Sequence, residues 1–135
     1  MEEDAGSELV YLGAADILGL HAAVLGCTEA EALAHLRDAQ ALEGALARPL
    51  SHAHYQGADI AMQAAVLAHG IAESQPFIDG NKRTALAAMR TFLKLNGHTV
   101  RATQQERAAW ILGLAHGSTV ENLAVRLREV LHLGI

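Results

Sequence analysis

The chain has 135 residues and a formal net charge of −5, and hydrophobic residues make up 51% of it. This length fits one domain that buries a core without metal or disulfide cross-links. The acidic balance argues against non-specific nucleic-acid binding, and no apolar run approaches the ~20 residues that span a bilayer. The lone Cys27 cannot form an internal disulfide and the acidic start is no signal peptide, so we expect a cytoplasmic protein without a membrane partner.

Leu and Ala supply most of the apolar residues, whereas aromatic residues make up only 4% of the chain. That composition favours helix over sheet. We expect an all-α fold, a single compact bundle of about six helices, with residues 1–8 as a flexible lead and 9–135 as the domain. Helical spacing and stop signals predict helices over 14–25, 28–47, 58–74, 80–96, 103–115 and 118–132.

Local signals set several of these boundaries. Three capping boxes, in which a hydroxyl and a carboxylate satisfy free backbone N–H groups, predict helix starts at Thr28/Glu31, Thr103/Glu106 and Ser118/Glu121. Pro49 and Gly57 predict an irregular stretch over 48–57, whose two His and one Tyr could overhang a site. Residues 98–102 form a connector with a strand-like piece.

One stretch concentrates chemistry: Gln-Pro-Phe-Ile-Asp-Gly-Asn-Lys-Arg-Thr over 75–84, between two predicted helices. The N-terminus of the second helix carries free N–H groups and a partial positive charge, which attract phosphate. Gly80 lets the backbone approach a ligand closely. Asp79 offers a hard oxygen ligand for Mg²⁺, which takes one or two carboxylates together with substrate phosphates.

The next three residues complete a possible polyphosphate cradle. Asn81 can cap the helix or donate to phosphate oxygens, Lys82 is a mobile point charge, and Arg83 is a planar fork. A structural explanation stays open, because Asp-Gly-Asn is also a common turn and cap sequence and the two cations could form a solvated helix face. Phe77 is a core anchor under either interpretation.

The order of residues from Gln75 to Leu86 resembles the signature of the Fic/Doc family, His-x-Phe-x-Asp/Glu-Gly/Ala-Asn-x-Arg. Lys82 and Leu86 make it most similar to the Doc (death-on-curing) branch. The resemblance implies an all-α toxin of a bacterial toxin–antitoxin pair that uses ATP and Mg²⁺ to phosphorylate a threonine of elongation factor Tu. It further implies that Asp79 holds Mg²⁺ or orients the target, that residues 80–83 bind phosphates, and that a Phd-like antitoxin binds nearby.

Gln75 departs from the signature, because the family has a His there as general base. Gln has no titratable group, and loss of a general base typically costs ~10²–10⁴-fold in rate. The change could be engineered, could mark a pseudoenzyme that only binds partners, or could be offset by another base. The histidines considered for that role are His52, His54, His69 and His98, and His69 is expected to face away from Gln75.

Two alternatives to the kinase stay open. AMP transfer is the usual activity of the wider Fic branch, and a non-catalytic antitoxin-binding module needs no base at all. Trp110 is expected to serve the core or a groove, and Arg90 is expected to be a solvated cation.

Overall fold

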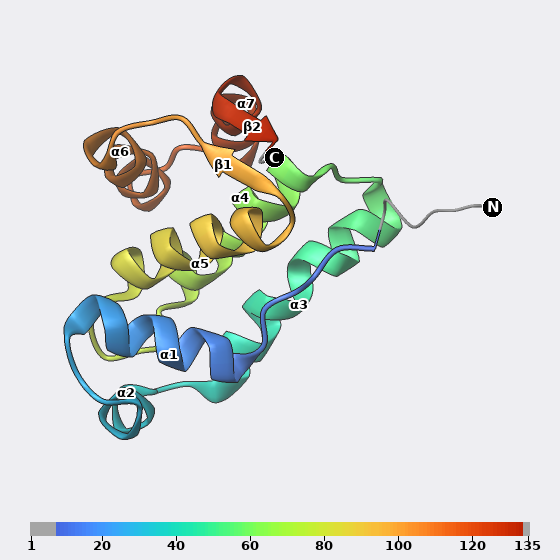
Figure 1. The fold of residues 1–135 in the computed structure, drawn as a ribbon. Helices are drawn as coiled ribbons and strands as arrows, with labels where there is room; N and C mark the ends of the chain where they lie inside the picture. Colours follow the sequence, from blue (N-terminus) through green and yellow to red (C-terminus); the bar gives the residue numbers. More distant parts are fainter. Residues whose placement is uncertain (1–7, 134–135) are drawn as a thin grey trace.

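The computed structural model describes residues 8–133, so the first seven residues of the expected lead lie outside the described part (Figure 1). The described residues form helices and one small two-stranded sheet, which confirms the all-α prediction. By itself, no described helix is both long and apolar enough to cross a bilayer. The elements are α1 Ala14–Leu25, α2 Glu29–His35, α3 Ala39–Gln56, α4 Ile60–Ser74, α5 Asn81–Leu95, β1 His98–Val100, α6 Gln104–Ala115, α7 Val120–Val130 and β2 Leu131–Leu133.

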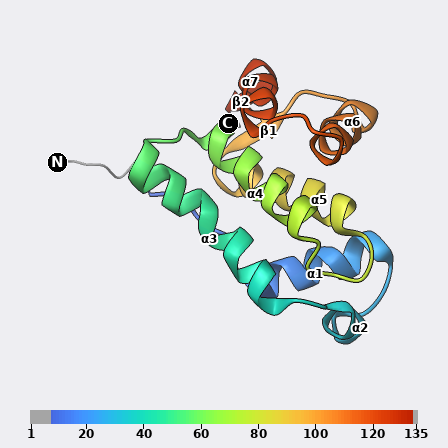
Figure 2. The same cartoon turned by 180° about the vertical axis from the view of Figure 1, so that it is seen from behind.

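Helix α4 is the centre of the fold and packs against α3, α5, α6 and α7 (Figures 1 and 2). The sequence predicts one apolar face for it, but α4 is buried around most of its circumference because small residues fill its other faces. At Gly70 a Cβ would lie 3.0 Å from Cβ of Ala45, so the glycine permits the close approach of α3. The helix that leads into the motif therefore sits on a rigid core.

The helix predicted over 28–47 is two helices, which raises the number of described helices to seven. The chain is extended at Leu36 and restarts at Asp38, whose carboxylate accepts a hydrogen bond from the backbone N–H of Ala41 at 2.9 Å. An Asp N-cap inside the expected helix is the physical reason for the second start. The break leaves residues 36–38 available to pair with another segment.

The irregular stretch predicted over 48–57 is wrong, because α3 continues to Gln56. Pro49 is buried within α3, and this burial offsets the missing backbone donor. Gly57 does end the segment, in the left-handed conformation at φ 63°. This end of α3 lies at the far side of the molecule from the α4–α5 loop (Figures 1 and 2), so it does not overhang the motif.

The C-terminal part closes on itself through the sheet, in which β1 and β2 pair antiparallel. The strand-like piece at 98–102 is confirmed, whereas the last helix ends at Val130 rather than His132. The capping boxes at Thr28 and Thr103 are confirmed. The third is wrong by one residue, because Thr119 is the N-cap and accepts from the backbone N–H of Asn122.

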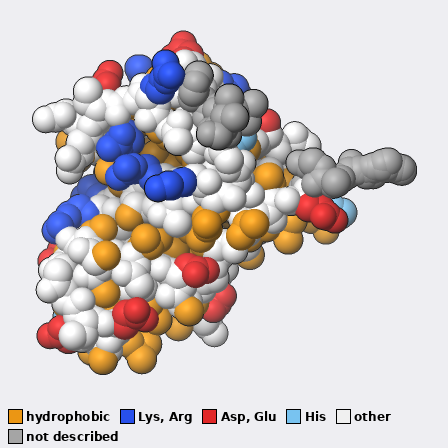
Figure 3. Space-filling model, viewed as in Figure 1, with side chains coloured by type: hydrophobic (Ala, Val, Ile, Leu, Met, Phe, Trp, Pro, Cys, Tyr) orange, Lys and Arg blue, Asp and Glu red, His pale blue; other side chains and the backbone are white. Residues whose placement is uncertain are grey.

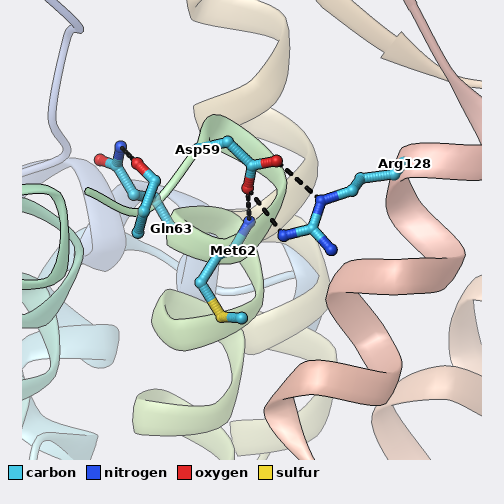
Figure 4. Close-up of polar contacts among 5 residues, drawn as sticks. Asp59, Met62, Gln63 and Arg128 are labelled. Carbon is cyan, nitrogen blue, oxygen red and sulfur yellow. Dashed lines mark hydrogen bonds and ion pairs between the residues drawn. The ribbon is translucent and has the colours of Figure 1, made fainter. Parts of the chain in front are cut away.

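A polar contact ties the start of α4 to α7 (Figure 4). Asp59 caps α4 by accepting from the backbone N–H of Met62 at 2.9 Å, and it also receives two hydrogen bonds from the guanidinium of Arg128, at 2.7 and 3.1 Å. These contacts, the Arg128 hydrogen bond first, hold the pKa of the Asp59 carboxyl below its usual value despite partial burial. This junction therefore uses its charges for structure.

Apolar residues on α5 and α7 complete the core. The stripe predicted for α5 is confirmed at four positions, and the fifth, Leu86, is partly buried. On α7, Leu123 and Leu127 are buried as expected, but Val125 is half exposed because it lies on the opposite face. Trp110 packs against the core as predicted.

Candidate functional site

The six residues predicted to form the catalytic and phosphate-binding site line one cavity of about 410 Å³ at the loop between α4 and α5. Ala72 and Ile78 complete the lining. The structure therefore brings the predicted set together at the N-terminus of α5. The residues that line the cavity and were predicted are Gln75, Asp79, Gly80, Asn81, Lys82 and Arg83.

Phe77 anchors the loop, as predicted. Its ring is fully buried and stacks on the ring of His21 from α1, with centroids 3.8 Å apart and planes 8° apart. Its backbone forms an isolated antiparallel bridge with Leu36 in the α2–α3 connector. The loop is thus fixed from the side of the core, whereas the neighbouring Ile78 is 61% exposed.

Asn81 ties the end of the loop back to its middle. Its side-chain oxygen accepts from the backbone N–H of Phe77 at 3.0 Å, and its amide group donates to the carbonyl of Phe77 at 2.9 Å. Both polar atoms of the side chain are therefore engaged in shaping the loop. That Asn81 also contacts phosphate stays a prediction. In this conformation its side chain stabilises the loop.

The α2–α3 connector holds the loop from the other side. The carbonyl of Pro76 accepts from the backbone N–H groups of Arg37 and Asp38, at 2.7 and 3.0 Å, and the Arg37 guanidinium donates to the carbonyl of Gln75 at 2.6 Å. The N–H of Ile78 donates to the carbonyl of His35 at 2.9 Å. Sequence reasoning missed this support, because it treated 28–47 as one helix.

Gly80 is required by both conformation and space. It caps α5 with φ 75°, in the left-handed region, and a Cβ there would lie 2.9 Å from Cδ2 of Leu25. No side chain caps the start of α5. Its first backbone N–H groups are consequently left for water or an anionic ligand at the cavity.

Residues of opposite charge line the same cavity. The carboxylate of Asp79 is exposed and accepts from the backbone N–H of Gly80 at 2.8 Å, while Lys82 is exposed and has no ion-pair partner among residues 8–133. No group of three or more His, Cys, Asp or Glu that could hold a metal lies within the described residues. A divalent cation bound here would need oxygen ligands from a substrate.

Arg83 reaches toward α1 and donates from its guanidinium to the carbonyl of Val24. That carbonyl lies in the last turn of α1, where the helix dipole favours a cation. Arg83 is exposed and lines the cavity. It therefore joins α1 to the candidate site while its planar group stays accessible to solvent.

Gln75 lies at the end of α4 with φ 49°, and it is the non-glycine residue with a positive φ in the described chain. This conformation is uncommon outside glycine and stores strain at the site. The expectation that His69 faces away is wrong, because it lines an adjoining cavity of about 190 Å³ together with Glu73, Gln75 and Lys82. Of the four histidines considered as a base, His69 is thus the one beside the motif.

The other three lie elsewhere. His52 and His54 are in the last turns of α3, at the far end of the molecule, and His98 begins β1. Neither of the two cavities beside the motif has any of them in its lining.

One buried histidine under the loop, His21, was not singled out by the sequence. His21 is completely buried, and its Nδ1 lies 2.9 Å from the hydroxyl of Thr84 on α5. Burial, with a smaller contribution from His35, lowers the pKa of His21, and the nearby Asp79 charge opposes that shift. His21 is sealed from substrate and therefore supports the loop rather than serving as a base. Helical spacing places His21 one turn from Ile17, which is the signal that could have identified it as a core residue.

Comparison with known families gives one match. The model of the Fic/DOC family matches residues 11–93, which run from the segment before α1 nearly to the end of α5 and contain the whole motif. No curated protein was found to match the chain. The family match spans more than half of the sequence and includes every residue that lines the motif cavity. The chain therefore belongs to the Fic/DOC family.

Proposed function

We propose that this protein is a Doc-type toxin domain that binds ATP with Mg²⁺ and is built to transfer the γ-phosphate to a threonine of elongation factor Tu. The observation that carries the proposal is the convergence of Asp79, Lys82 and Arg83 on one cavity at the uncapped N-terminus of α5. Backbone N–H groups, a helix dipole and two cations all favour a polyphosphate there. Lys82 and Leu86 support the Doc branch over the wider Fic branch.

The residues present fit a magnesium ion that arrives with its nucleotide. Asp79 can offer one carboxylate oxygen, since the other accepts from the N–H of Gly80. Mg²⁺ commonly takes one or two carboxylates and fills its remaining positions with phosphate oxygens and water. When bound, the ion would neutralise phosphate charge, Asp79 would hold it, and Lys82 and Arg83 would bind the remaining phosphate oxygens.

Gln75 supports an impaired rather than a fully active enzyme. Its side chain can hydrogen-bond and position a hydroxyl, but it cannot accept the proton. His69 lines the adjoining cavity with Gln75, and its Nε2 lies 3.6 Å from the carboxylate of Glu73. It is the candidate to accept the proton in the place of the missing base.

Nucleotide binding tests the cradle without relying on activity. Calorimetric titration of ATP with Mg²⁺ is expected to show binding that Lys82→Ala weakens about tenfold or more, because it removes a charge-assisted contact. The matched control is Arg126→Ala, which removes an exposed cation on α7. Equal affinity of the Lys82→Ala variant and the parent would refute the cradle.

Label transfer then tests the reaction. The parent, Gln75→His and His69→Gln are each incubated with elongation factor Tu, Mg²⁺ and ATP labelled at either the α- or the γ-phosphate. We expect γ-label on the factor, increased by Gln75→His and abolished in the parent background by His69→Gln. Retention of the α-label instead would select AMP transfer and overturn the kinase assignment.

A non-catalytic module is the second candidate, and Gln75 is the observation that favours it. In that case the protein binds a Phd-like antitoxin, or a target protein, and transfers nothing. Absence of label from every variant, together with ATP binding that still depends on Lys82, would select this function. The neighbouring reading frame offers an independent check, because a small gene with a DNA-binding head is expected there for a toxin–antitoxin pair.

A further inference from the structure

A second cavity of about 410 Å³ lies between α5, β1 and α6, away from the motif. Figure 3 shows Lys and Arg side chains gathered on this face, between α5 and α6. We call this cavity the basic pocket. Its lining contains four cationic or titratable basic residues and no Asp or Glu: Arg90 and Lys94 from α5, His98 from β1 and Arg107 from α6.

Among the described residues, no carboxylate lines the basic pocket beside its cations. Arg90 and Lys94 are one turn apart on α5, where like charges repel. Within residues 8–133 neither has an ion-pair partner. Exposed lysines and arginines usually spread out or pair with acids, so this convergence costs free energy unless an anion offsets it.

Arg107 carries the clearest sign of that cost. Its Nη1 donates to the carbonyl of Ala102 at 2.6 Å, but its Nε is buried and has no hydrogen-bond partner in the part of the chain that the structure describes. Burial, followed by the charge of Arg90, lowers the pKa of its guanidinium. A buried donor that lacks an acceptor is uncommon in folded proteins and points to a missing ligand or water.

The other walls of the basic pocket limit what that ligand is. Leu20, Ala87 and Val100 form an apolar side, and Thr91 offers a hydroxyl. The volume lies in the range of small-molecule sites. An extended polyanion such as RNA is disfavoured, because the chain has a net charge of −5 and the cations cluster over one small cavity.

We propose that the basic pocket binds a phosphate monoester, with the dianionic phosphate held by Arg90, Lys94 and Arg107 and the organic part against Leu20 and Val100. Two arginine forks suit phosphate oxygens, and a dianion offsets more of the clustered charge than a single carboxylate. The basic pocket shares no lining residue with the motif cavity. Arg83 and Arg90 are seven residues apart on α5, which is about 10 Å along the helix axis.

Phenyl phosphate and inorganic phosphate are the probes, and chemical-shift changes of assigned backbone amides in the full chain are the readout. We expect both to bind, phenyl phosphate more tightly, with the largest shifts at Thr91 and Thr99 and small ones at Gly80 and Asn81. The double variant Arg90→Gln/Lys94→Gln is expected to weaken binding at least tenfold. The control Arg126→Gln, on α7, should leave it unchanged.

The motif supplies the internal comparison. Lys82→Ala should leave binding of phenyl phosphate at the basic pocket unchanged, even if ATP binding is lost. Shifts centred on residues 80–83, or equal affinity of the Arg90→Gln/Lys94→Gln variant and the parent, would overturn the proposal. Because neither Arg90 nor Lys94 is buried, the double variant should retain the parent's unfolding midpoint, so loss of binding is not loss of fold.

Discussion

The two ends of α4 make opposite use of charged residues. At its start, Asp59 caps the helix and is satisfied by Arg128 from α7. At its end, the motif loop is held by backbone hydrogen bonds and by Phe77, whereas Lys82 has no ion-pair partner among the described residues and Asp79 accepts only from its neighbour. At the first junction the charged side chains stabilise the fold, and at the second they remain available to a ligand.

This difference separates structural from functional polarity within one helix. Substitution of a residue that stabilises the fold is expected to lower the protein's free energy of unfolding. Substitution of a residue that serves a ligand is expected to weaken ligand binding alone. Four substitutions test that division, and each is measured by chemical denaturation of the full chain.

Phe77→Ala should have the largest effect. It removes a completely buried ring that stacks on His21, so we expect a loss of about 3–5 kcal/mol in the free energy of unfolding. The adjacent Ile78→Ala is the control, because that side chain is 61% exposed and should change stability by less than about 0.5 kcal/mol. Similar losses at both positions would contradict the anchor.

Asn81→Ala should come next. It removes both hydrogen bonds to the backbone of Phe77 and leaves a part-buried N–H and carbonyl without that partner, at a cost of about 1–3 kcal/mol. Asn122→Ala, at an exposed position of α7, is the matched control. If the two variants unfold at the same denaturant concentration, Asn81 does not shape the loop.

Arg128→Gln should cost about 0.2–1 kcal/mol at neutral pH, because both members of this ion pair are about half exposed. The pKa of Asp59 is lowered in the folded protein, so the pair stabilises above the unfolded carboxyl's value of 3.8 and the contribution is lost as pH falls through the folded value. The stability gap between parent and variant should therefore close below about pH 4. A gap that widens on acidification would show that the pair is not its source, and Arg126→Gln should show no gap at any pH.

Lys82→Gln should have the smallest effect on folding, within about 0.5 kcal/mol, while it weakens ATP binding. A substantial loss of stability together with unchanged nucleotide affinity would show that Lys82 serves the fold rather than a ligand.

The sequence was informative wherever one local signal decided the outcome. The motif residues from Gln75 to Arg83 share a cavity because a loop and one helix turn keep neighbours together. The capping boxes at Thr28 and Thr103 worked because their hydrogen bonds span three residues. The all-α class followed from composition, since Leu and Ala leave few positions for strands.

The failures share a physical cause, which is tertiary contact. Pro49 was expected to begin an irregular stretch over 48–57, but it is buried inside a continuous α3, and this burial overrides its local preference. The helix breaks at residues 36–38, and hydrogen bonds from Arg37 and Asp38 to Pro76 and Gln75 stabilise the break. These partners lie about 38 residues away in the sequence, so no local pattern reveals them. His21 was overlooked because its role depends on Phe77 and Thr84 from other segments.

The hydrogen bonds from Arg37 and Asp38 to the carbonyl of Pro76 give the motif loop a reporter outside itself. These two amide protons cannot exchange with solvent deuterium while the loop stays in place. Their exchange rates therefore measure how often the loop opens, at two positions that do not themselves line the motif cavity. A ligand that locks the loop should slow both protons together and leave the amides at the start of α7 unchanged.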